Sequence, residues 1–131
     1  MAPSPTERDT LFKAFARALF TCDTDALYKV VSPDFLWRYH DGVSVTRELQ
    51  GPEAIAAHLA ERKAFYSAHH FHEVVYHHLP EVSFMTFRVS ETVQATGEAR
   101  EQCGVEFYTF KAGKIALKDV YRKPAPVPPS R

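Results

Sequence analysis

The sequence predicts an α+β domain in which three N-terminal helices pack on one curved, mostly antiparallel β-sheet. Two patterns predict this class. Apolar residues recur at helical spacing in the first half of the chain, and from residue 71 to residue 122 they alternate with polar residues at a period of two. The chain has 131 residues, of which 45% are hydrophobic. That length is enough for one domain with one core and is too short for two.

The first predicted helix runs from about Thr6 to Thr21 and follows a flexible leader over residues 1–5. Thr6 and Asp9 match an N-cap pattern in which aspartate replaces the more usual glutamate. An apolar stripe lies at helical spacing and consists of Leu11, Phe15, Ala18, Leu19 and Cys22. This stripe predicts a helix that covers the sheet.

Three further elements are expected before residue 51. A short second helix over residues 25–31 ends before Ser32, because a residue that precedes proline is pushed out of the α region. Residues 34–39 alternate aromatic and other side chains, with Trp37 on the aromatic face, and predict a strand. The polar segment 43–50 is expected to be a loop or a frayed strand.

A third helix is predicted to begin at Pro52, where the missing N–H does no harm, and to end near Ser67. His58 falls on or beside its buried face. Four strands are then predicted, with hairpin turns at Gly97 and Gly113, and they span residues 71–78, 81–96, 98–110 and 114–122. The last nine residues, 123–131, contain four prolines and are expected to form a flexible tail.

Charge and cysteine content argue against several classes of function. Sixteen basic and sixteen acidic residues cancel and no basic run stands out, so neither nucleic acid nor an anionic membrane is an expected partner. The first ten residues lack the apolar core of a signal peptide, and no run approaches the ~20 apolar residues of a membrane span. A soluble, cytoplasmic protein is expected, with Cys22 and Cys103 as reduced thiols.

The seven histidines raise the question of a metal site. His70 and His72 are two residues apart and could share a strand face, but adjacent histidines such as His77 and His78 point to opposite faces. No HExxH or comparable spacing is present. We therefore expect no metal and no other cofactor, and interpret these histidines as exposed or hydrogen-bonded strand residues.

The order of the segments resembles the nuclear transport factor 2-like and SnoaL-like domains. The resemblance spans Arg8 to Arg122 and is carried by SPDF at residues 32–35, GPEAI at 51–55 and FYTFKAGKI at 107–115. It implies a single domain over residues 6–122, with a cone-shaped fold, a pocket between sheet and helices, and a homodimer made through the sheet. The family includes ketosteroid isomerase, scytalone dehydratase and polyketide cyclases.

Transfer of the ketosteroid isomerase residues gives a mixed result. The resemblance implies that Phe15 replaces the catalytic tyrosine, that Tyr39 replaces the general-base aspartate, and that Glu106 replaces the protonated aspartate. Only Glu106 keeps an acid, which argues against steroid isomerisation by that mechanism. A shift of one or two residues would bring His40 or Asp41 toward the base position, but it would also turn the strand over.

Glu106 is the main candidate catalytic residue, with Tyr39 and Tyr108 as proton donors beside it. It lies in mid-strand among aromatic residues, where an ionised carboxylate is costly to bury unless it is paired, protonated or used. A neutral Glu106 with a raised pKa would be a hydrogen-bond donor or general acid, and an ionised one a general base. The alternative is an ion pair with a basic residue on a neighbouring strand: Lys118, Arg88 or Arg100.

The candidate pocket lining is aromatic or apolar with one histidine, and consists of Phe15, Trp37, His58, Met85 and Phe87. The same residues could instead form the core or a dimer interface. Asp119 joins the candidates if the odd-numbered face of the last strand points inward. Two hypotheses follow. One is a cofactor-free isomerase, cyclase, lyase or hydrolase acting on a small apolar cyclic molecule, and the other is a non-catalytic module that binds a hydrophobic ligand or dimerises.

Overall fold

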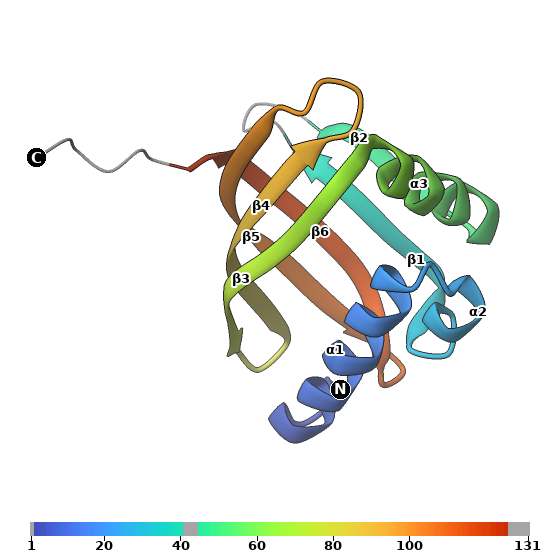
Figure 1. Ribbon diagram of the computed structural model, residues 1–131. Helices are drawn as coiled ribbons and strands as arrows, with labels where there is room; N and C mark the ends of the chain where they lie inside the picture. Colours follow the sequence, from blue (N-terminus) through green and yellow to red (C-terminus); the bar gives the residue numbers. More distant parts are fainter. Residues whose placement is uncertain (1, 41–44, 126–131) are drawn as a thin grey trace, which may run out of the picture.

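The computed structural model describes residues 2–40 and 45–125. In this part of the chain, three helices lie against one face of a six-stranded sheet, as Figure 1 shows. The predicted α+β class is confirmed. The elements in chain order are α1 (Pro5–Phe20), α2 (Thr24–Leu27), β1 (Val31–His40), β2 (Val45–Gln50), α3 (Pro52–Phe65), β3 (Tyr66–His78), β4 (Val82–Val93), β5 (Ala99–Lys111) and β6 (Lys114–Pro124).

The strand order across the sheet is β2-β1-β6-β5-β4-β3. All neighbouring strands are antiparallel except β1 and β6, which run parallel near the middle, so the sheet is mixed but mostly antiparallel as predicted. Gly97 and Gly113 have φ values of 72° and 77° at the two predicted hairpin turns. The sheet curves without closing, and its concave face receives the helices (Figure 1).

Helix α1 begins at Pro5, one residue before the expected boundary, and the predicted Thr6 cap is wrong. Ser4 is the cap instead. Its Oγ accepts a hydrogen bond from the Glu7 N–H at 3.2 Å, and Glu7 Oε1 accepts one from the Ser4 N–H at 3.1 Å. This capping box uses the usual serine and glutamate pair, and Pro5 occupies the first turn, where it needs no N–H partner.

Four other segments differ from the predicted ones. Residues 45–50, expected as a loop or a frayed strand, form the strand β2 because they pair antiparallel with β1, and Leu49 within it is buried. Strand β3 starts at Tyr66, immediately after α3, and α2 ends at Leu27. Strand β6 extends to Pro124, into the segment expected as a tail, and residues 126–131 lie outside the described part.

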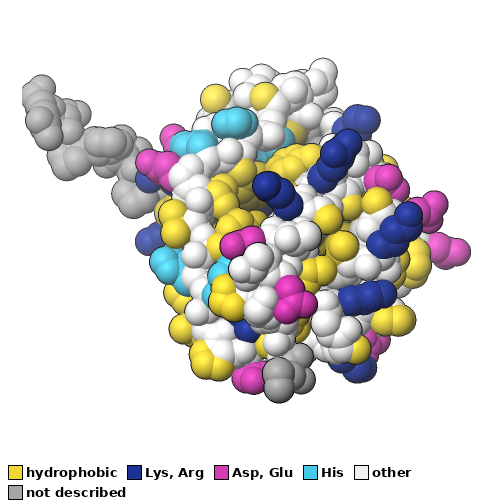
Figure 2. Space-filling view, turned by 90° about the horizontal axis from the view of Figure 1, so that it is seen from below, with side chains coloured by type: hydrophobic (Ala, Val, Ile, Leu, Met, Phe, Trp, Pro, Cys, Tyr) yellow, Lys and Arg dark blue, Asp and Glu magenta, His cyan; other side chains and the backbone are white. Residues whose placement is uncertain are grey.

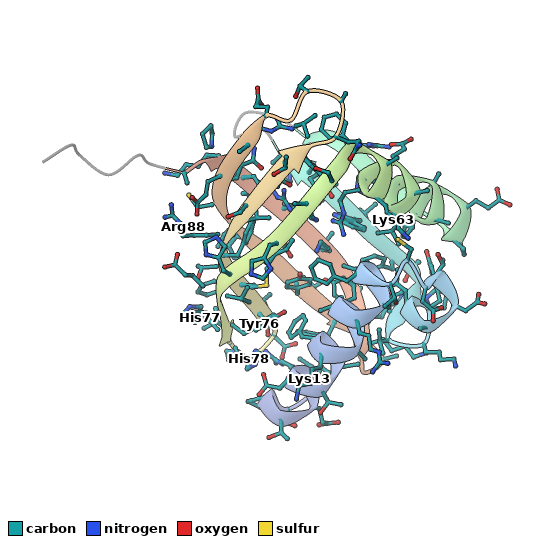
Figure 3. All side chains as sticks on the ribbon, in the orientation of Figure 1. Lys13, Lys63, Tyr76, His77, His78 and Arg88 are labelled. Atoms are coloured by element: carbon teal, nitrogen blue, oxygen red, sulfur yellow. The ribbon has the colours of Figure 1, made fainter. Side chains whose placement is uncertain are left out.

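The core fills the space between the helices and the concave face of the sheet. Its largest members are fully or almost fully buried: Phe12, Phe15, Leu27, Phe35, Trp37, Ile55, Leu59, Phe87 and Tyr108. In Figure 3, Tyr76 lies on the side of β3 that faces α1, whereas His77 lies on the outer side. Tyr76 stacks on Phe12 with ring centroids 4.7 Å apart, so the concave face of the sheet is lined with aromatic rings.

None of the described helices is long and apolar enough to cross a lipid bilayer.

Candidate functional site

Glu106 lies on the concave face of β5 and is only 1% exposed. Its Oε1 accepts hydrogen bonds from the Tyr108 hydroxyl and from Lys118 Nζ, the latter at 3.0 Å. The alternative that Glu106 pairs with Lys118 is therefore confirmed. Burial raises the pKa of Glu106, but the Lys118 charge and the Tyr108 hydrogen bond outweigh it and lower the pKa below the ordinary 4.5. Of the two states left open for Glu106, the lowered pKa favours the ionised carboxylate.

Lys118 reaches Glu106 because the register of β5 and β6 places it diagonally across. Tyr108 is opposite Lys118 and Glu106 is opposite Val120, so alternate residues of both strands share the concave face. The ammonium group is surrounded by aromatic rings and lies 4.8 Å from the centroid of Trp37. Burial lowers the pKa of Lys118, and the Glu106 charge opposes that shift.

A small cavity of about 130 Å³ adjoins this ion pair. Glu106, Tyr108 and Lys118 form its polar wall, and the remaining wall is mainly aromatic and aliphatic. Two predicted lining residues, Phe15 and Met85, also line it. Both hydrogen bonds to the Glu106 carboxylate fall on Oε1, and within the described residues no donor reaches Oε2. A molecule bound in this cavity would therefore lie beside the Glu106 carboxylate.

A larger groove of about 940 Å³ lies between α3, β3 and the ends of β1 and β6. Tyr39 and His58 line it, and the Tyr39 hydroxyl is 2.9 Å from His58 Nε2. Arg62 lines both the groove and the small cavity, so the two hollows adjoin at this side chain. In Figure 2, dark-blue basic side chains lie next to yellow hydrophobic ones on the face viewed. Six of the eight predicted site residues thus line these two neighbouring hollows, and Trp37 and Phe87 do not.

Tyr39 and His58 are both neutral near physiological pH. Burial raises the pKa of Tyr39 to about 12, although the nearby Arg62 and Arg122 charges act in the opposite direction. Burial lowers the pKa of His58 to about 4, and the charges of Arg47 and Arg62 lower it further. A neutral phenol and a neutral imidazole can exchange a hydrogen bond in either direction, so this pair can donate to or accept from a bound molecule.

The sequence profile of the SnoaL-like domain family matches residues 12–118. The chain belongs to the SnoaL-like domain family. The resemblance predicted from the sequence is confirmed. No curated protein matches the chain.

Solved structures similar to this SnoaL-like domain cover most of its length. An NTF2-like protein from Burkholderia xenovorans LB400 has a TM-score of 0.80 at 20% identity and covers 92% of each chain. A candidate polyketide cyclase from Xanthomonas campestris pv. campestris has a TM-score of 0.73 at 17% identity, over 88% of this chain and 90% of that one. TerC, co-crystallised with polyporic acid, has a TM-score of 0.70 at 13% identity, over 87% and 89%. At such identities the likeness shows the fold alone.

Two predicted lining residues are core residues of the SnoaL-like domain. Trp37 is 0% exposed and packs against His58 with ring centroids 4.9 Å apart. Phe87 is 3% exposed and lies under the guanidinium of Arg122, 5.4 Å from it. Neither side chain lines the small cavity or the groove, so both contribute to the site through core packing.

The odd-numbered face of β6 points away from the site. Asp119 forms ion pairs with His40 Nε2 at 2.6 Å and with Arg38 at 3.2 Å, on the face opposite Lys118. Asp119 and His40 are therefore not pocket residues, because the strand alternation that brings Lys118 inward turns Asp119 outward. Asp41 lies outside the described residues. Among the residues described, no three His, Cys, Asp or Glu side chains converge to a metal-binding group.

A second buried carboxylate, Glu91 on β4, was missed by the sequence analysis. It is 2% exposed and pairs with Arg122 at 3.3 Å and with His69 at 3.1 Å. Burial raises the pKa of Glu91, but the His69 hydrogen bond and the Arg122 charge outweigh it and lower the pKa. The period of two in β4 and β6 could have indicated this buried pair. Glu91 lies on the same face of β4 as Phe87, and Arg122 lies on the same face of β6 as Lys118.

Proposed function

We propose that this SnoaL-like domain is an enzyme that moves a proton within a small, largely apolar cyclic carbonyl compound, in an isomerase- or cyclase-type reaction that needs no cofactor. The observation that carries the proposal is the Glu106 carboxylate at the wall of an apolar cavity. One of its oxygens is fixed by Tyr108 and Lys118, and the other receives no hydrogen bond from the described residues. Such a fixed carboxylate is preorganised to act as a general base.

The proposed reaction begins with proton abstraction. Glu106 Oε2 takes a proton from the carbon next to the substrate carbonyl, and the C–H electron pair becomes the double bond of an enolate. The negative charge moves to the carbonyl oxygen, where the Lys118 ammonium stabilises it. The protonated Glu106 then returns the proton to another carbon, which yields an isomer and restores the carboxylate. A low pKa makes Glu106 a weak base, so this cationic stabilisation is essential to the proposal.

The size of the cavity limits what reacts there. A cavity of about 150 Å³ lined by apolar side chains holds one benzene ring, and the cavity beside Glu106 measures about 130 Å³. It is therefore suited to one small ring. The rest of a substrate would extend past Arg62 into the groove, whose size is within the range of ordinary ligand sites.

The Lys118 ion pair also favours a second candidate function. A buried carboxylate in an ion pair is a common structural feature, and pairing alone does not require catalysis. Under this alternative the domain binds a hydrophobic ligand in the same cavity without transforming it. The two functions differ in one measurable property, which is proton exchange at a carbon of the bound molecule.

Hydrogen–deuterium exchange tests the proposed function. In deuterated water, the wild-type protein is expected to accelerate exchange at the carbon next to the carbonyl in at least one member of a series of small cyclic ketones, followed by proton NMR. Glu106→Gln is expected to reduce that rate by about 100-fold, because the amide cannot take the proton. Glu81→Gln makes the same chemical change at an exposed position and should leave the rate unaltered.

The double variant Glu106→Gln/Lys118→Met removes both charges together and leaves no unpaired buried charge. If this variant is folded and has lost exchange, the loss is not caused by an unpaired charge. Circular dichroism of each variant checks the fold. Exchange that persists in Glu106→Gln contradicts the role of Glu106. Ketones that bind to the wild type without any accelerated exchange contradict catalysis and favour the ligand-binding alternative.

We further propose that the domain forms a homodimer through the convex face of the sheet. A row of rings in contact crosses that face with centroid separations of 4.5 to 6.0 Å, from β3 through β4, β5 and β6 to β1: His77, Phe84, Phe107, Tyr121 and His40. Phe107, at the centre of the row, is 40% exposed. An exposed row of aromatic side chains is typical of a protein interface.

Phe107→Arg is expected to convert the dimer to a monomer, because it places a charge at the centre of an apolar contact that is repeated by the two-fold symmetry. Sedimentation velocity measures the change. Lys13→Arg on α1 is a control at an exposed position outside the sheet. A wild-type protein that sediments as a monomer, or a Phe107→Arg variant that remains a dimer, contradicts this interface.

A further inference from the structure

Arg62 on α3 occupies the junction of three hollows: the small cavity, the groove and a third hollow beside the end of α1. The side chain is half-buried, and its guanidinium carbon lies 5.6 Å from the centroid of Trp37. Among the described residues no carboxylate pairs with Arg62, and its hydrogen-bonding contact is with the neutral Tyr39 hydroxyl. A half-buried guanidinium without an anionic partner is an anion-binding group.

The charges around the groove support the same conclusion. Three arginines line it, and Glu61 is the single described carboxylate that does so. Arg47 is paired with Glu61 at 3.3 Å, and Arg122 is paired with Glu91. Arg62 is therefore the lining arginine whose charge no described carboxylate offsets, and that charge contributes to the lowered pKa of His58.

We infer that Arg62 binds the carboxylate, or an equally acidic enol oxygen, of a small cyclic acid whose ring occupies the cavity beside Glu106. This inference rests on the proposed function and specifies its substrate class. A planar guanidinium can present two parallel N–H donors to a carboxylate, and Arg62 also contacts Trp37 and hydrogen-bonds Tyr39. The anionic group would lie at the junction and the reacting ring inside the cavity.

Lys118 and Arg62 then have separate roles. Lys118 is paired with Glu106 and is 5% exposed. When Glu106 takes the proton, the Lys118 charge is no longer offset and can stabilise the charge that develops within the cavity. Arg62 is further out, where a substrate first arrives with its charge already formed. Arg62 thus binds the substrate and the transition state equally well. Such binding raises substrate affinity and does not change the rate of the chemical step.

A matched pair of probes tests the inference in the intact protein. Phenylacetate and phenylacetamide have the same ring and nearly the same shape, but only the first is charged. Trp37 is the single tryptophan of the chain and lies under Arg62, so its fluorescence and its indole NMR signal report binding at this place. Phenylacetate is expected to bind at least about tenfold more tightly than the amide, since charged hydrogen bonds contribute more than neutral ones.

Arg62→Gln is expected to remove that preference while affinity for phenylacetamide stays the same. Arg17→Gln makes the same change at an exposed position of α1 and should preserve the preference. Equal binding of both probes to the wild type, or a preference that survives in Arg62→Gln, overturns the inference. The comparison on the wild type and its dependence on salt need no variant, so a poorly folded Arg62→Gln does not weaken the test.

Failure of this inference is distinguishable from failure of the proposed function. Phenylacetate that binds through Arg62 to a protein without proton-exchange activity supports the acid-binding site and contradicts catalysis by Glu106. A protein that exchanges protons of neutral ketones but binds phenylacetate and phenylacetamide equally supports catalysis by Glu106 and contradicts the acid-binding site.

Discussion

Lys118→Met is expected to lower the free energy of unfolding by about 4 kcal/mol, because removal of one partner of a buried ion pair leaves the other charge uncompensated. Glu106 is 1% exposed and Lys118 is 5% exposed, so water cannot replace the missing ammonium group. Methionine matches the length of the lysine stem and preserves contact with Trp37, which limits any cavity. Urea denaturation followed by Trp37 fluorescence measures the loss.

The double variant Glu106→Gln/Lys118→Met is the control for that prediction. It removes both charges, and the glutamine oxygen still accepts the Tyr108 hydrogen bond, so most of the stability is expected to return. If the double variant is as unstable as Lys118→Met, the loss comes from altered side-chain contacts around Trp37 and not from the unpaired carboxylate.

The pH dependence of stability should also change sign. In the wild type the pKa of Glu106 is below 4.5, so its contribution to stability is complete above pH 4.5 and is lost as the pH falls through the lower folded value. Without Lys118, burial raises the pKa of Glu106 above the unfolded value. The folded variant then binds the proton more tightly than the unfolded chain, so its stability decreases as the pH rises above 4.5. An unchanged pH profile in Lys118→Met contradicts the pairing.

The sequence predicted those helices and strands in which buried side chains recur at the spacing typical of that element. In β4 the buried side chains alternate through Met85, Phe87 and Val89, which is the pattern that a strand with one covered face requires. Residues 45–50 carry no such pattern, and they form β2 only because β1 offers an unpaired edge. Pairing with another strand is a tertiary effect, and the spacing of apolar residues within one segment does not predict it.

The site was predicted in part for the same reason. Glu106 was found because a charge within an aromatic strand is anomalous. The direction of its pKa shift depends on Lys118, twelve residues away. It also depends on the register between β5 and β6, which the sequences of these two strands do not specify by themselves. Arg62 was not chosen as a site residue, because an arginine on a helix is usually solvated. Its proposed role follows from the position of α3, which brings it to Trp37.

Arg8 gives the second prediction of large effect, and it concerns how α1 is fixed over the site. Arg8 is 3% exposed and has no described carboxylate partner. Its guanidinium instead donates hydrogen bonds to five oxygens, which belong to Pro3, Leu79, Pro80, Val82 and Ser83. Four of these oxygens lie in the β3–β4 turn or at the start of β4, so this one side chain joins the start of α1 to the sheet.

Arg8→Met is expected to reduce the free energy of unfolding by about 4 kcal/mol, because each buried acceptor left without a donor costs about 1–3 kcal/mol. Arg17→Met, at an exposed position of the same helix, should change it by less than about 0.5 kcal/mol. Urea denaturation of both variants provides the comparison, and equal effects at the two positions would contradict the anchoring role of Arg8. Because α1 also carries Phe15 into the cavity wall, Arg8→Met should weaken phenylacetate binding even under conditions where the variant is folded. That loss would show that the apolar wall opposite Glu106 depends on a hydrogen-bonded anchor at the far end of the helix.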